Sequence, residues 1–168
     1  TIYDLPALKP PSWDKSKPRV IYVGRLDVNS EGLLVLSSDG PLAQTMMRPE
    51  TALRRVYRVR VKGMLKPEEI AALARGITIE GIFYRGAEFT VEKDEGRANR
   101  WYRCVLTEGK NREIRKLMEH FGCVVNRLIR VQYGPFILDD LPIGAVKEVP
   151  PAKVQSFLDY LASKGVKI

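Results

Sequence analysis

A carboxylate and a cation stand close together in residues 24–27, Gly-Arg-Leu-Asp. An apolar run at residues 20–23 precedes them and predicts a buried strand that ends at the glycine. A second apolar run at residues 33–36 predicts another strand, so we expect Asp27 on a rigid support. A carboxylate held in this way can act as a nucleophile or a general base. A structural ion pair between Arg25 and Asp27, pinning the loop, explains the same residues.

Basic side chains gather where a predicted strand gives way to a predicted helix, over residues 107–116. Lys110, Arg112 and Arg115 join the backbone N–H groups of a helix predicted for residues 111–121, an arrangement that suits a phosphate or a carboxylate. The two arginines are three residues apart and therefore share a helix face. The alternative is a solvated basic helix start, balanced by two nearby glutamates.

Two predicted strands carry further candidate side chains. Residues 57–62 alternate apolar and basic side chains, which predicts one buried face and one cationic face. Tyr57 begins this strand and can stack on a base, exchange a proton, or simply pack. In the strand predicted for residues 124–133, Leu128 shares a face with Arg130, so an apolar side chain lies among cations as a flat base would require. Core packing is the alternative role for this leucine.

The composition favours one domain with a polyanionic partner. The chain has 168 residues, is 45% hydrophobic, and carries 28 Lys and Arg against 20 Asp and Glu, a formal net charge of +8. A surplus of this size makes nucleic acid the first candidate partner, although spare surface lysines also produce one. No apolar stretch approaches the ~20 residues needed to cross a bilayer. We therefore expect no membrane partner.

Cofactor chemistry has little support in the sequence. His120 and Cys123 form one possible metal-ligand pair, but no second pair completes a tetrahedral site, so no metal is expected. The chain has neither a P-loop nor a dinucleotide fingerprint, which argues against a nucleotide cofactor. Cys104 and Cys123 are expected as reduced, packed thiols, because no secretory signal precedes them.

The order of elements predicts an α+β domain with a mixed, mainly antiparallel sheet and flanking helices. The first eighteen residues are rich in proline and read as an extended lead-in. Further strands are predicted at residues 77–79, 87–93, 101–106 and 145–149, and further helices at residues 41–47, 67–75 and 151–163.

Four motifs follow one another over residues 1–150: Gly-Arg-Leu-Asp at 24–27 continuing to Leu-Leu at 33–34, Tyr-Arg-Val at 57–59, Glu-Gly-Lys-Asn-Arg-Glu-Ile-Arg at 108–115, and Arg-Leu-Ile-Arg at 127–130 with Gly134. In this order they resemble the RsuA family of bacterial ribosomal RNA pseudouridine synthases. Asn-Arg-Trp-Tyr at 99–102, ahead of Leu-Thr-Glu-Gly at 106–109, is most similar to members of the RluB type, which act on large-subunit RNA.

The resemblance implies a pseudouridine synthase fold with a central catalytic cleft, and isomerisation of uridine to pseudouridine in 23S ribosomal RNA. This reaction conserves composition and needs no cofactor. Asp27 would be the essential carboxylate, Tyr57 would contact the uracil and assist proton loss from C5, and Arg115 would pair with Asp27. Whether the carboxylate attacks the ribose or removes a sugar proton stays open. The substrate-binding residues implied are Arg25, Lys110, Arg112, Leu128 and Arg130.

The resemblance also concerns domain organisation and partners. Family members usually carry an amino-terminal S4 RNA-binding domain and a further strand region with a Lys-Pro motif, so residues 1–168 are expected to be a catalytic domain without either. The expected substrate is a uridine in an RNA hairpin or bulge, and the expected protein is a cytoplasmic monomer. A non-catalytic RNA-binding or ribosome-assembly module is the rival function. A hydrolase that uses Asp27 on a small anion is disfavoured, because the motifs hold no second catalytic carboxylate or histidine.

Overall fold

The computed structural model describes residues 4–5, 8, 20–94 and 98–168. The proline-rich lead-in expected for the first eighteen residues therefore lies almost entirely outside the described residues. The same holds for most of the polar turn expected between the strands at residues 87–93 and 101–106.

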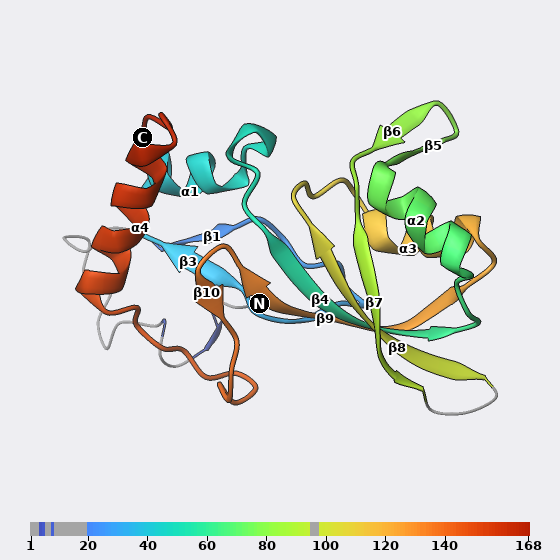
Figure 1. Ribbon diagram of the computed structural model, residues 1–168. Helices are drawn as coiled ribbons and strands as arrows, with labels where there is room; N and C mark the ends of the chain where they lie inside the picture. The colour runs from blue at the N-terminus through green and yellow to red at the C-terminus, as the bar shows by residue number, and fades with distance from the viewer. Residues whose placement is uncertain (1–3, 6–7, 9–19, 95–97) are drawn as a thin grey trace.

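Three long strands form the centre of the main sheet (Figure 1). The strand β4 (Arg55–Lys62) lies between β8 (Asn99–Leu106) and β9 (Val124–Tyr133). Beyond β8 the sheet continues with β7 (Glu88–Asp94), and beyond β9 with β10 (Phe136–Ile137). All of these neighbours pair antiparallel. The predicted α+β class with a mainly antiparallel sheet is confirmed.

One hydrophobic cluster lies under the part of this sheet drawn at the right of Figure 1. The helices α2 (Pro67–Arg75) and α3 (Glu113–His120) pack there. From β4 the cluster takes Val59 and Val61, which are fully buried, whereas Arg58 on the alternate face is only partly buried. The apolar and cationic faces predicted from the period-two pattern are therefore confirmed.

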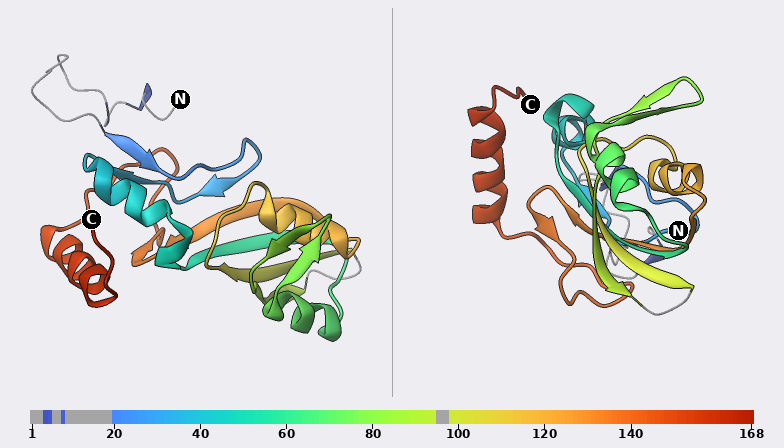
Figure 2. Two further views of the ribbon diagram at one scale, coloured as in Figure 1. Left: turned by 90° about the horizontal axis from the view of Figure 1, so that it is seen from above. Right: turned by 45° about the vertical axis from the view of Figure 1, so that its right-hand side comes forward.

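A second hydrophobic cluster occupies the other end of the molecule (Figure 2). It is built by the antiparallel pair β1 (Ile21–Val23) and β3 (Val35–Ser37), and by the helices α1 (Gly40–Met47) and α4 (Pro151–Ser163). The buried Tyr133, at the end of β9, belongs to this cluster. The long strand β9, which carries Leu128 of the first cluster and Tyr133 of the second, thus connects two cores.

Several element boundaries differ from the sequence-based prediction. Residues 145–149 do not form a strand: this stretch is mostly exposed, begins in a turn closed by Ala145 N–H to Pro142 O, and pairs with no strand among the described residues. The helix expected from residue 111 begins at Glu113, because Arg112 adopts a left-handed conformation with φ 53°. The prediction also missed β6 (Ile82–Tyr84), which forms a hairpin with β5 (Ile77–Ile79).

The loop that carries Asp27 is fixed to the main sheet by its own backbone. Within it, β2 (Glu31–Gly32) pairs parallel with β9, and Leu33 N–H donates to Arg130 O at 2.7 Å. Gly32 has φ 103°, and a Cβ at this position would overlap the backbone of Arg130. Only glycine therefore allows the loop to approach β9 this closely.

Replacing Gly32 by alanine is expected to lower the free energy of unfolding by about 2–5 kcal/mol, because it combines a strained backbone with a steric overlap. Gly81 is a matched control: it also has positive φ, but a Cβ there would meet nothing within 4 Å. Gly81→Ala should lose only the conformational part, about 1–2 kcal/mol. Urea unfolding of both variants measures the difference. Equal losses would show that the loop does not depend on this close approach.

Candidate active site

A cleft of about 700 Å³ opens between the two hydrophobic clusters. One wall is the loop that leaves β1, and the opposite wall is the connection from β8 into α3. The floor consists of side chains from β4 and β9. The residues that line the cleft fall into three groups. The wall after β1 includes Tyr22, Gly24, Arg25, Leu26, Asp27 and Ser30, and the wall between β8 and α3 includes Leu106, Glu108, Gly109, Lys110, Asn111, Arg112, Glu113 and Ile114. The floor includes Arg55, Tyr57, Leu128, Arg130 and Tyr133.

Seven of the eight site residues predicted from the sequence line this cleft. They come from four separate parts of the chain, so the fold assembles what the motifs only suggested. The eighth, Arg115, is not among the lining residues. The seven are Arg25, Asp27, Tyr57, Lys110, Arg112, Leu128 and Arg130.

Arg115 binds the Asp27 loop through the loop's backbone. Its guanidinium donates to the carbonyl oxygen of Asn29 at 2.6 Å and to that of Val125 at 3.2 Å, and so joins the loop to β9. Burial and the charge of Arg112 lower the pKa of Arg115, while the charge of Asp27 raises it. Asp27 is therefore close enough to act electrostatically, although no ion pair joins these two described side chains. A direct role for Arg115 in the reaction stays a prediction.

Two further arginines fix the same loop. Arg127 makes a bidentate ion pair with Glu31, with nitrogen to oxygen distances of 2.7 and 3.0 Å. Arg130 donates through Nε to the carbonyl oxygen of Leu33 at 2.9 Å. The structural ion pair considered between Arg25 and Asp27 is not formed. In the part of the chain that the structure describes, the loop is held by contacts from α3 and β9.

Tyr57 and Leu128 form part of the floor. Burial raises the pKa of Tyr57 and the nearby Arg130 guanidinium opposes this, so the phenol stays protonated at neutral pH. Leu128 is only 5% exposed, packs in the first cluster and also lines the cleft. Its position therefore fits core packing and is also compatible with an apolar surface at the site. Arg130 is 3% exposed, and its Nη2 has no hydrogen-bond partner. Because Arg130 lines the cleft, this buried donor is a candidate contact for a ligand.

A buried network beside the cleft was missed by sequence reasoning. Arg55, which is 5% exposed, donates to the carbonyl oxygen of Leu53 at 3.2 Å and to the Tyr133 hydroxyl at 3.0 Å. That hydroxyl donates in turn to the carbonyl oxygen of Met46 at 2.9 Å. The Tyr133 ring also lies 4.8 Å from the Arg55 guanidinium and 5.2 Å from that of Arg130. The only sequence signal was a basic residue at the start of an apolar strand.

Two buried carboxyl groups were also underestimated. In the alternative interpretation of residues 107–116, Glu108 and Glu113 balance a solvated helix start, yet each is only 3% exposed and lines the cleft. Glu108 is paired with the ammonium of Lys110. Glu108 lies two residues before Lys110 and five before Glu113, and this spacing does not reveal whether a carboxyl group is buried. The sequence therefore gave no clear signal of their burial.

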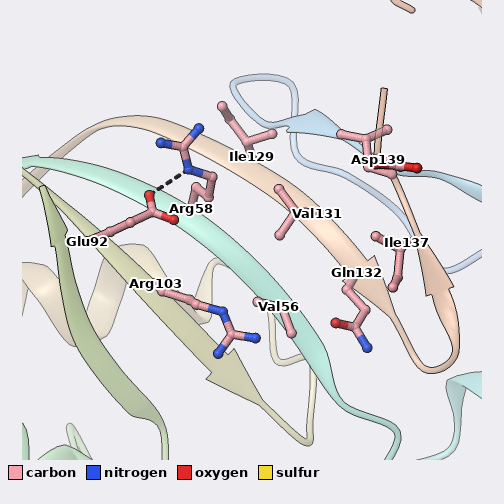
Figure 3. Close-up of a pocket in the computed structure, with 10 residues that line it drawn as sticks. Val56, Arg58, Glu92, Arg103, Ile129, Val131, Gln132, Ile137 and Asp139 are labelled. Atoms are coloured by element: carbon pink, nitrogen blue, oxygen red, sulfur yellow. Dashed lines mark hydrogen bonds and ion pairs between the residues drawn. The ribbon is translucent and has the colours of Figure 1, made fainter. Parts of the chain in front are cut away.

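A second hollow, of about 470 Å³, lies on the sheet face that carries Val56 and Arg58 (Figure 3). Arg58 is paired there with Glu92 at 2.6 Å, and Arg103 lies on the neighbouring strand. None of the predicted site residues lines this hollow. The cleft between the two clusters is therefore the candidate active site.

The fold and the cleft agree with the family comparisons. A family model described as RNA pseudouridylate synthase matches residues 8–120, more than half of the chain, and the chain belongs to this family. An "Uncharacterized RNA pseudouridine synthase" of Rickettsia felis is 47% identical over 136 residues, 79% of this chain and 57% of that relative. A "Ribosomal large subunit pseudouridine synthase B" of Yersinia pestis is 41% identical over 169 residues, 99% of this chain and 50% of that relative. The resemblance to the RluB type is confirmed.

A solved structure shares the fold. The structure titled "Crystal structure of pseudouridylate synthase" superposes with a TM-score of 0.73 at 23% identity, covering 81% of this chain and 58% of that one. The chain spans about half the length of the curated relatives it matches. Among the described residues, no helix is both long and apolar enough to span a membrane.

Tyr133→Phe is expected to lower the free energy of unfolding by about 1–3 kcal/mol, because it leaves a buried Arg55 donor and the carbonyl of Met46 without their shared partner. Tyr160→Phe is the matched control, since the Tyr160 side chain is 48% exposed. It should change stability by less than about 0.5 kcal/mol. Thermal and urea unfolding measure both. An equally small effect at Tyr133 would mean that water replaces the hydroxyl.

Proposed function

We propose that this chain is the catalytic part of an enzyme that isomerises uridine to pseudouridine in large-subunit ribosomal RNA. The observation that carries the proposal is the position of Asp27 in a cleft with Tyr57 and Leu128 on its floor and cations around it. Membership of the RNA pseudouridylate synthase family and the large-subunit relatives support it. A module that only binds RNA has no use for a carboxylate placed among phosphate-binding cations.

The reaction moves the uracil on its own ribose. The bond from N1 to C1′ breaks, a bond from C5 to C1′ forms, the proton on C5 leaves, and N1 gains a proton, so atoms and electrons balance without a co-reactant. An ionised Asp27 serves as the nucleophile at C1′ or as the base toward a ribose proton. In either route it must lie beside the sugar, and its fixed loop provides that position.

The floor and rim of the cleft suit a base that has left its stack. Tyr57 and Leu128 offer an aromatic and an apolar surface to the uracil, and the unpartnered Nη2 of Arg130 offers a donor. Because its pKa is raised, Tyr57 acts through its ring and its hydroxyl proton rather than as a phenolate. Extrusion of a base costs a few kcal/mol and is cheapest in a hairpin loop or bulge, which favours such a site as the substrate.

The cations differ in their freedom to bind phosphate. Among the described residues, the exposed side chains of Arg25 and Arg112 have no hydrogen-bond or ion-pair partner. They are therefore suited to the RNA backbone. Lys110 is already engaged by Glu108 and lies 5.7 Å from the Tyr84 ring, so its first role is to shape the wall of the cleft.

The wider organisation is also a proposal. We infer that the full enzyme adds an S4 RNA-binding domain and a further strand region to this catalytic part, in agreement with the longer relatives. The enzyme would work as a cytoplasmic monomer, without metal or cofactor, on a large-subunit RNA hairpin or bulge.

Asp27→Asn should abolish the release of tritium from 5-tritiated uridine in unmodified large-subunit ribosomal RNA, by at least about 1000-fold, because the amide cannot replace an essential carboxylate. RNA binding, measured by filter retention, should be unchanged within about threefold, since the change is isosteric. Asp140→Asn, at an exposed position outside the cleft, should keep normal release.

The same assay is run with a version of the enzyme that includes the amino-terminal domains. Release that depends on Asp27 in either version supports catalysis. Firm RNA binding with no release in either version would contradict it and leave an RNA-binding module.

Tyr57→Phe tests the hydroxyl apart from the ring. Turnover should fall by about 10- to 100-fold, because one hydrogen-bonding group near the reacting base is lost. RNA affinity should persist, because the phenyl ring still covers the uracil. Tyr57→Leu should lose both. Single-turnover tritium release and filter binding separate the two effects, and full turnover in the phenylalanine variant would show that the hydroxyl plays no part.

A further inference from the structure

Two carboxyl groups lie side by side in the wall of the cleft. Glu108 and Glu113 are each 3% exposed, and both bind Lys110, Glu108 at its ammonium and Glu113 at its backbone N–H, so the two carboxyl groups are close neighbours. Two ionised carboxylates at such a distance repel strongly in a buried environment, and neither can donate a hydrogen bond to the other. The pair is therefore more stable with one proton between its two groups.

The partners of the two groups show which one carries the proton. Glu108 accepts from the ammonium of Lys110 and, at 2.8 Å, from the backbone N–H of Arg85. Both are donors, so they favour an ionised Glu108. Glu113 Oε2 accepts from the backbone N–H of Lys110 at 2.8 Å, whereas Oε1 is buried without any partner. A proton on Glu113 turns that unpartnered oxygen into a donor toward Glu108.

We propose that Glu108 and Glu113 share one proton, and that this carboxyl pair is a positioning device that shapes residues 109–112 for RNA. The inference rests on the proposed function. It follows from the contacts around that segment: Lys110 is held at its ammonium by Glu108 and at its backbone N–H by Glu113. The next residue but one, Arg112, has a left-handed backbone and presents an exposed guanidinium at the cleft.

The electrostatics agree with this arrangement. Burial raises the pKa of Glu113 to about 7, the Lys110 N–H opposes the shift, and the charge of Glu108 adds to it. Burial also raises the pKa of Glu108, but the contacts from Lys110 and Arg85 outweigh burial and hold the net value below the usual range. The Cys104 thiol on β8 also feels the charge of Glu113, and burial raises its pKa well above the usual value.

The remaining charged neighbours of the pair are all cations. They are Lys110 in the same segment, Arg85 ahead of β7, Arg55 on β4, whose guanidinium flanks Gly109, and Arg112 and Arg115 around the start of α3. His120, at the far end of α3, is the single histidine of the chain.

A rise in pH through about 7 removes the shared proton and places two negative charges side by side. Residues 109–112 then lose their fixed shape, and RNA affinity should fall. Stability follows the same sign: the unfolded chain ionises Glu113 at its ordinary pKa of 4.5, so the free energy of unfolding falls between about pH 4.5 and 7 and is level above.

Glu113→Gln tests the proposal, because the amide has the shape of the neutral acid and keeps a donor. RNA dissociation constants are measured at about pH 6 and about pH 8 for the enzyme with and without this change. From the lower to the higher pH, the RNA affinity of the wild type should weaken about tenfold more than that of the glutamine variant. At the lower pH, the two proteins should bind RNA equally well. Thermal unfolding of Glu113→Gln should likewise lose the decline with pH. Glu113→Ala should bind weakly at both values.

Glu119→Gln is the matched control, since Glu119 is exposed on the same helix and the charge change is equal. It should follow the wild type, including any contribution of His120. Loss of RNA affinity at both pH values in Glu113→Gln, with the fold intact, would show that the ionised carboxylate is needed and would overturn the proposal. An unchanged pH dependence would overturn it too. The carboxyl pair is tested by RNA affinity and by thermal unfolding, neither of which requires turnover. An absence of tritium release would therefore contradict the proposed function and leave the test of the carboxyl pair unaffected.

Discussion

The close contact between the Asp27 loop and β9 is the constraint on which the rest of the site depends. Gly32 lies against the backbone of Arg130, in a register that places β2 parallel to β9. The side chain of Arg130 returns to the loop at the carbonyl of Leu33. Because β9 also carries Leu128, one strand fixes both the carboxylate and the surface for the base. Their separation is thus set by backbone geometry, which varies less than side-chain packing.

Buried charge is concentrated in the walls and floor of the cleft. Arg55, Glu108, Glu113 and Arg130 are all at most 5% exposed. Burial of a charge is costly unless it is paired or hydrogen-bonded, and these groups meet that requirement mainly through backbone carbonyls, backbone N–H groups and one another. The exceptions are single atoms, Nη2 of Arg130 and Oε1 of Glu113. Both residues line the cleft, where a ligand or a shared proton can complete the contacts.

The sequence predicted the elements and candidate residues better than it predicted their environment. The alternation in β4 and the helix α2 depend on local patterns, and the structure confirms them. The strand expected at 145–149 was wrong because pairing needs a partner that local sequence does not reveal. The burial of Arg55, Glu108 and Glu113 was not predicted for a similar reason, because burial depends on contacts between segments far apart in the chain. The family resemblance named the cleft residues, and only the structure showed how Arg115 contacts the loop.

On the proposed function, the engaged cations favour selectivity for one substrate despite the formal net charge of +8. Arg115, Arg127 and Lys110 are committed to the loop or to Glu108, so their contacts define shape rather than attract any polyanion. Arg25 and Arg112 remain at the rim, on opposite walls of the cleft. In the proposed complex, a phosphate backbone that contacts both arginines lies at the cleft that Asp27 and Tyr57 also line. Nonspecific attraction is therefore concentrated at the rim, while geometry at the floor decides which nucleotide enters.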